Sequence, residues 1–134
     1  MTTTTATPSR ARTITLWTTQ IVIGLFMVVA AAIPKLAGEA TAVQMFHVIG
    51  GGDTLRYVTG LLELAGGIGL LLAPLAGLAA LGLVGLLIGA TYTQLFVLDG
   101  AGYALTPALL GVILAIVAWA RRSDIKALPS RLRR

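Results

Sequence analysis

The chain has no cysteine and few charged residues. Without cysteine, disulfide bonds, thiolate metal sites, CxxC redox chemistry and cysteine nucleophiles are excluded. Charged residues make up only 11% of its 134 residues and hydrophobic residues make up 57%, whereas an ordinary soluble domain carries roughly 25% charged residues. A fold of this composition could not cover its surface with polar groups, so a soluble globular domain is excluded.

Three long stretches contain no charge at all. They cover residues 14–34, 64–98 and 100–120, and a run of about 18 or more mainly apolar residues is long enough to cross a bilayer. The sequence therefore predicts an integral membrane protein. Its length suits one domain, and we predict a disordered tail, a membrane domain and a basic tail at residues 1–13, 14–122 and 123–134.

Prolines, glycines and charged residues divide the membrane domain into four predicted spans, at about residues 14–33, 55–73, 75–98 and 102–120. Pro34 ends the first span, and Pro107 lies near the start of the fourth, where we expect a kink. Residues 38–49 predict a short helix in the outer interface. The predicted fold class is all-α: a transmembrane four-helix bundle with a short interfacial helix between the first and second spans.

The basic residues gather at the two ends of the chain. The predicted tails and their edges hold eight Lys and Arg residues: Arg10, Arg12, Arg121, Arg122, Lys126, Arg131, Arg133 and Arg134. Because basic residues stay on the cytoplasmic side, we predict a multi-pass protein of the inner (plasma) membrane with cytoplasmic N- and C-termini. The basic charge then reflects contact with anionic lipid headgroups, and no nucleic-acid partner is predicted.

A cleaved signal peptide is the alternative interpretation of the N-terminus, because Arg10 and Arg12 precede an apolar run that ends in small residues. That run is about 20 residues long, whereas a signal core has roughly 7–15. We therefore favour a first membrane span.

Glycines mark the predicted helix-packing faces. Gly82, Gly85 and Gly89 share one stripe of the third span, and Gly66 and Gly67 lie on the second. Glycines let helix backbones approach closely where lipid gives no hydrophobic drive. We therefore expect these positions to be tightly packed.

Glu63 is the only acidic residue inside any predicted span. It lies about eight residues into the second span, roughly 12 Å below the outer edge at ~1.5 Å per residue. A charge at a helix centre costs about 2.5–3.5 kcal/mol on insertion scales, which roughly cancels the favourable insertion of the span's leucines. We therefore predict that Glu63 faces the bundle interior, where it is protonated or paired.

Three side chains are candidate partners of Glu63: Arg56 on the same helix face, Lys35 at the outer end of the first span, and Gln94 on the third. In a functional interpretation, Glu63, Lys35 and Arg56 form a polar site that opens outward, because an acid in a span indicates function by default. In a structural interpretation, they form a buried hydrogen-bonded clamp that orders the bundle. The sequence leaves both open.

The other candidate groups are few. His47 is the only histidine and lies in the predicted interfacial helix, so we predict no metal site and assign it to packing or to the edge of the polar site. Gln20, in the cytoplasmic half of the first span, is predicted to bond across helices. No nucleophile–base–acid set, phosphate loop or pair of catalytic carboxylates can be found in the sequence.

Several motifs occur in a characteristic order: Trp17-xx-Gln20, Pro34-Lys35-Leu36-xx-Gly38, Phe46-xxx-Gly50 and Arg56-Tyr57-xx-Gly60-xx-Glu63-Leu64-xx-Gly67. This order resembles the DoxX-like family of small four-helix membrane proteins, over about residues 16–122. Ala32 stands where the family often has glycine. The resemblance implies a membrane protein of a family with varied roles. Its founding members resemble membrane subunits of a thiosulfate:quinone oxidoreductase, other members are linked to oxidative-stress complexes, and distant animal relatives resemble membrane chaperones.

Three hypotheses about function follow. The first is a non-enzymatic accessory or partner-binding protein with a polar site around Glu63, which binds a protein partner or a second copy of itself in the lipid bilayer. The second is the membrane subunit of a quinone-linked oxidoreductase or oxidative-stress complex, in which Glu63, Lys35 and His47 bind a headgroup or relay a proton. Quinone is then the one candidate cofactor, and the redox centre belongs to a partner, because this chain has no cysteine and no cofactor motif. A small transporter ranks third.

Overall fold

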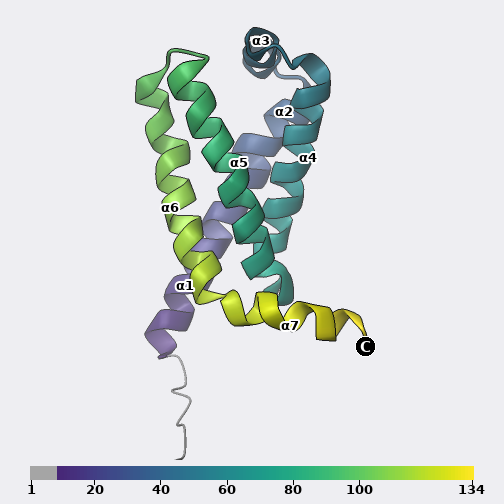
Figure 1. Cartoon of the computed structure of the whole chain (residues 1–134), viewed down its shortest axis with the longest axis vertical. Helices are drawn as coiled ribbons and strands as arrows, with labels where there is room; N and C mark the ends of the chain where they lie inside the picture. Colours follow the sequence, from purple (N-terminus) through teal and green to yellow (C-terminus); the bar gives the residue numbers. More distant parts are fainter. Residues whose placement is uncertain (1–8) are drawn as a thin grey trace, which may run out of the picture.

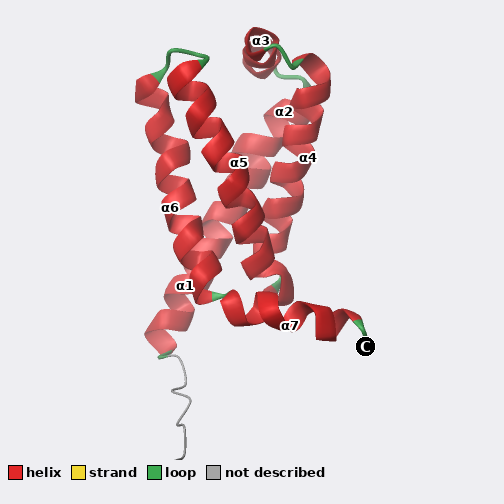
Figure 2. Cartoon of the chain, in the orientation of Figure 1, coloured by secondary structure: helices red, strands yellow, loops and turns green. Residues whose placement is uncertain are grey.

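The computed structural model describes residues 9–134, and helices make up all of its regular secondary structure in that range. Long helical segments run side by side along the molecule, and a short helix caps each end of the bundle (Figures 1 and 2). The all-α prediction is confirmed. Residues 1–8 of the predicted N-terminal tail lie outside the described part of the chain.

The first long segment consists of α1 (Arg10–Phe26), the π-helical η1 (Met27–Ala32) and α2 (Ile33–Ala37). It begins four residues before the predicted start at residue 14, because the Ser9 hydroxyl caps it by accepting a hydrogen bond from the Arg12 backbone N–H at 3.2 Å. It also continues past Pro34, where the sequence predicted its end. Pro34 lies in the first turn of α2, where its missing N–H is tolerated.

Gly38 ends this segment, with a φ of 75° in the left-handed region. The predicted short helix follows as α3 (Ala40–Ile49). The Glu39 carboxylate caps α3 by accepting hydrogen bonds from the backbone N–H groups of Thr41 and Ala42, and these bonds lower the pKa of Glu39. Gly50 ends α3 with a φ of 95°.

The remaining segments are α4 (Gly52–Leu70), a tight turn through η2 (Ala73–Leu75), α5 (Ala76–Phe96), and η3 (Ala101–Ala104) leading into α6 (Leu105–Ala120). The sequence predicts a kink near Pro107. In the structure, Pro107 lies in the first turn of α6, where its missing N–H is tolerated, and the 3-10 turn η3 precedes that helix. Buried side chains from four of these segments meet in the middle of the bundle: Met27, Leu70, Leu83 and Leu114.

The predicted basic tail at 123–134, for which the sequence predicted no secondary structure, is mostly helical. The helix α7 (Arg122–Leu132) lies across the end of the bundle, against η2 and α5 (Figure 1). Asp124 stabilises its first turn, since an acid there complements the helix dipole. Ile125 packs where Gly77 leaves room on α5.

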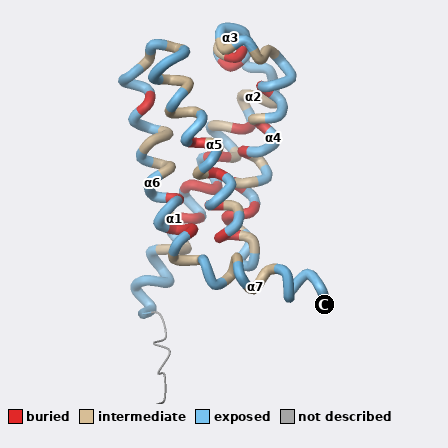
Figure 3. Tube along the Cα trace, in the orientation of Figure 1, coloured by how far each residue is buried: buried red, intermediate tan, exposed pale blue. Residues whose placement is uncertain are grey.

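Three segments of the described chain are long and apolar enough to cross a membrane: Arg10–Ala37, Ala73–Phe96 and Ala101–Ala120. Large apolar side chains on their outer faces are exposed, among them Val22, Ile88, Val112 and Ile116, and exposed residues cover the outside of the bundle in Figure 3. This pattern suits a surface in contact with lipid. The helix α4 is of similar length, but its composition is less apolar because it carries Asp53, Arg56 and Glu63.

Glycines serve two different purposes in the bundle. At the crossing of α1 and α4, a Cβ on Gly67 would lie 2.9 Å from the Gly24 carbonyl oxygen, and the reverse contact is equally short. The predicted tight packing is therefore present there. The prediction of tight packing is wrong for Gly82, Gly85 and Gly89, because a Cβ at any of these positions would meet nothing within 4 Å.

This difference gives a matched test. Gly67→Ala should destabilise the protein by about 1–3 kcal/mol, since the methyl group must displace helix backbone. Gly82→Ala should leave the stability unchanged or raise it slightly, because alanine favours a helix and the position has room. Unfolding midpoints in a denaturing detergent titration measure both, and equal midpoints would contradict the close crossing.

Candidate functional site

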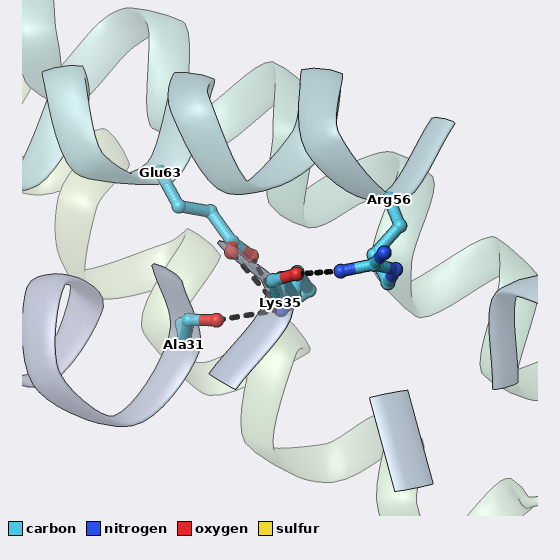
Figure 4. A network of polar contacts seen from close by, with 4 residues as sticks. All are labelled: Ala31, Lys35, Arg56 and Glu63. Carbon is cyan, nitrogen blue, oxygen red and sulfur yellow. Dashed lines mark hydrogen bonds and ion pairs between the residues drawn. The ribbon is translucent and has the colours of Figure 1, made fainter. Parts of the chain in front are cut away.

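Several polar groups gather where α2 meets α4, toward the end of the bundle that α3 caps (Figure 4). Lys35 lies on α2, one turn beyond the π-helical segment, and its Nζ donates a hydrogen bond to the Ala31 carbonyl oxygen at 3.1 Å. Ala31 lies in the π-helical segment, where the backbone hydrogen bonds are shifted by one residue. The Lys35 side chain therefore adds a donor in the irregular part of this helix.

Glu63, on α4, pairs with Lys35. The Lys35 Nζ lies 2.9 Å from Glu63 Oε2 and donates a hydrogen bond to Oε1 at 3.1 Å. Glu63 is only 7% exposed, and the ion pair with Lys35 is the one polar contact of its Oε2 within residues 9–134. The predicted inward-facing acid with a basic partner is therefore observed.

Arg56 is the third member of the polar group, but it does not bind Glu63 as the sequence suggested. Its Nη1 donates to the backbone carbonyl of Lys35, as drawn in Figure 4, and its Nη2 lies 2.9 Å from Asp53 Oδ1. Its guanidinium also stacks on the Tyr57 ring, 4.3 Å from the centroid. Arg56 thus closes the end of α2 and holds Lys35 through its backbone.

The ion pair forms part of the wall of a cleft of about 420 Å³ between α2, α3, α4 and α5. Phe46 and Ile49 of α3 cover it from one end, while uncharged polar side chains complete its lining: Thr59, Thr93 and Gln94. A cleft of this size, mainly apolar with a few polar groups, is typical of a small-molecule site. Gln94 therefore shares the cleft with Glu63 but makes no hydrogen bond to it within the described chain.

His47 lies elsewhere. It is exposed on α3 and is not among the residues that line the cleft. No group of three or more His, Asp and Glu residues that could hold a metal ion occurs within residues 9–134.

A second polar cluster, at the opposite end of the bundle, was only half predicted. Gln20 is completely buried. Its Nε2 donates to the Leu70 carbonyl at 3.0 Å, and its Oε1 accepts a hydrogen bond from Arg121 Nε at 2.9 Å. The cross-helix role of Gln20 is confirmed, whereas its partner Arg121, 101 residues later, was assigned to the basic end only.

A comparison of the chain with protein-family models finds a match. The DoxX-like family model matches residues 18–121, which include both polar clusters. The chain belongs to the DoxX-like family. Searches of curated proteins and of solved structures find no match to it. Membership of the DoxX-like family, together with the long apolar helices, makes the chain an integral membrane protein that crosses the bilayer more than once.

The ion pair predicts unequal effects of two substitutions at Glu63. Removing one partner of a buried pair leaves the other charge uncompensated, so Glu63→Ala should cost about 3–5 kcal/mol. Glu63→Gln should retain more folded protein, because its amide can still accept a hydrogen bond from Lys35. The folded yield in mild detergent, measured by size-exclusion chromatography, compares them.

The double variant Lys35→Met with Glu63→Met is the control. Replacing both charges with apolar groups of similar size is often neutral for stability, so this protein should fold about as well as the parent. Equal yields of Glu63→Ala, Glu63→Gln and the parent protein would show that the carboxyl group has no structural role.

Proposed function

We propose that this DoxX-like protein is a non-enzymatic accessory protein of the inner (plasma) membrane, and that the cleft beside Lys35 and Glu63 is its binding site. Four crossings, by α1–α2, α4, α5 and α6, would place both ends in the cytoplasm. Three observations support this arrangement: α4 packs against α1 and α5, the N-terminus of α1 and α7 lie toward the same end of the bundle (Figure 1), and the basic residues concentrate there.

The cysteine-free sequence allows a direct test of topology by single cysteines. With four crossings, a membrane-impermeant maleimide added to intact spheroplasts should label Thr41→Cys and Gly102→Cys, and should label Ser9→Cys and Ser130→Cys only after lysis. If α4 did not cross, Gly102→Cys would be protected and Ser130→Cys would be labelled, which would overturn the four-span arrangement.

The observation that carries the binding proposal is the buried ion pair in the wall of an apolar cleft. If the ion pair only ordered the bundle, we would expect other side chains to pack closely around it. Here the pair borders about 420 Å³ of space, within the usual range of ligand sites of roughly 300–1,000 Å³. The cleft therefore favours a small-molecule ligand over a purely structural role.

The second candidate, a membrane subunit of a quinone-linked oxidoreductase, is favoured by the shape and lining of the same cleft. A quinone carbonyl needs hydrogen-bond donors, and Lys35 Nζ and the Gln94 amide are donors among the lining residues. The apolar lining from Phe46, Ile49 and Leu86 suits the rest of such a ring. A bound quinone would accept electrons from a partner, while Lys35 would orient the head and Glu63 would hold or release a proton.

Binding of the headgroup alone is the test. A benzoquinone without a side chain should raise the thermal unfolding midpoint of the purified parent protein in a saturable way, because a ligand that binds only the folded state stabilises it. The same compound should not stabilise the Lys35→Met, Glu63→Met double variant.

Asp124→Asn, which removes one charge from an ion pair at the opposite end of the bundle, is the matched control and should respond like the parent. Equal stabilisation of the parent and of the double variant would reject the cleft as the site.

A further inference from the structure

A second apolar groove continues from the cleft along α4 and α5. It has a volume of about 580 Å³ and is lined by leucine, alanine and glycine residues, including Leu62, Leu78 and Gly82. Gly85 and Leu86 line both this groove and the cleft beside Lys35 and Glu63. The two spaces therefore meet and follow the same two helices.

Glycines on α5, which have no side chain, leave the space that forms this groove. Gly82, Gly85 and Gly89 recur at helical spacing on one face, and a Cβ at each would meet nothing within 4 Å. The glycines of α4 on the other side of the groove behave differently, since a Cβ on Gly66 would lie 2.5 Å from the Leu83 side chain. The helices α4 and α5 thus touch at Gly66 and leave open space beside it.

We propose that this groove seats the hydrocarbon tail of a single-chain amphiphile whose uncharged polar head lies in the cleft beside Lys35 and Glu63. The inference rests on the proposed binding function of that cleft and specifies the class of ligand. The polarity of the lining supports it: the groove along Leu62, Leu78 and Gly82 is apolar, whereas the polar residues all lie at the cleft end.

The chemistry of the cleft defines the head. Lys35 and Glu63 neutralise each other, and the other polar lining residues, Thr59, Thr93 and Gln94, carry no charge. A head with a net charge would therefore lie unpaired in a mainly apolar site, at a high cost. The Oε2 of Glu63 is buried and contacts only the Lys35 ammonium, at 2.9 Å, so it can still accept a hydrogen bond from a hydroxyl or similar donor on the head once the side chain turns toward the cleft.

An apolar helix of another chain is a weaker fit to the same space. Such a helix would cover the glycine stripe, but it would offer nothing to the polar cleft that is continuous with it. A ligand with one polar end and one long apolar end matches both halves.

Photo-crosslinking tests the position of the tail. The probe is a hydroquinone with a ten-carbon chain that ends in a diazirine, applied to the parent protein in lipid nanodiscs. Labelling should concentrate on residues 62–86 of α4 and α5 and should decrease when an excess of the same compound without the diazirine is added. Labelling spread evenly over lipid-facing residues of α6, such as Val112 and Ile116, and unaffected by that excess, would overturn the proposal.

Filling the groove is the second test. Gly85→Leu places a side chain in the open space shared by the two cavities, and it should fold at least as well as the parent because leucine is a better helix former than glycine. It should lose the competed labelling. Gly102→Leu, at another position with nothing within 4 Å of a Cβ and outside both cavities, is the matched control and should keep it.

The two proposals can fail separately. If the tailless benzoquinone stabilises the parent protein, and lengthening the chain adds nothing while Gly85→Leu labels like the parent, the tail groove is rejected and the headgroup site stands. If the tailless compound does not bind but the long-chain probe labels the groove in a competed way, the headgroup site is rejected. A decyl glycerol that competes better than a decyl hydroquinone would identify the ligand as a lipid rather than a quinone, and the reverse order would identify it as a quinone.

Discussion

A buried charge needs a partner, and this constraint organises the end of the bundle where α2 meets α4. An isolated Glu63 buried among apolar helices would be costly, and its partner Lys35 lies 28 residues earlier in the chain. For their atoms to meet at about hydrogen-bonding distance, α2 and α4 must have one relative depth and one relative rotation. The ion pair therefore sets the register of these helices, where apolar packing against lipid-like side chains discriminates weakly.

Other irregular features of this region follow from the same constraint. Lys35 reaches Glu63 from a helix that passes through π-helical turns and a proline, and its Nζ also supplies a donor to Ala31. The α2 helix then stops at Gly38, which leaves the Lys35 carbonyl free to accept a hydrogen bond from Arg56. Lys35 thus pairs with Glu63 through its side chain and with Arg56 through its backbone, so Arg56 holds the residue that forms the ion pair without taking part in that pair.

The sequence could predict those features for which every alternative arrangement has a large energetic cost. Long uncharged runs can hardly be anything but membrane helices, and a lone acid within them must turn inward, so the bundle and the partnership of Glu63 with Lys35 could both be derived. The direction of Arg56 could not, because its helical spacing from Glu63 does not reveal the free carbonyl of Lys35. The hydrogen bond from Arg121 to Gln20 could not be predicted either, because it depends on where the end of α6 lies relative to α1. The helix α7 was missed because a short basic segment has little helical tendency of its own and gains stability from packing against η2 and α5.

The glycines illustrate why a composition argument is incomplete in a membrane helix. Gly24 and Gly67 bring two backbones together, whereas Gly82, Gly85 and Gly89 leave a face of α5 bare, and the sequence pattern is the same for both. The bare face meets the cleft at the level of the ion pair, so the structural and functional interpretations of Glu63 need not exclude each other. A pair that is already neutral can order the helices and also offer polar contacts to an uncharged ligand, because binding would exchange hydrogen bonds without leaving a net charge in the hydrocarbon.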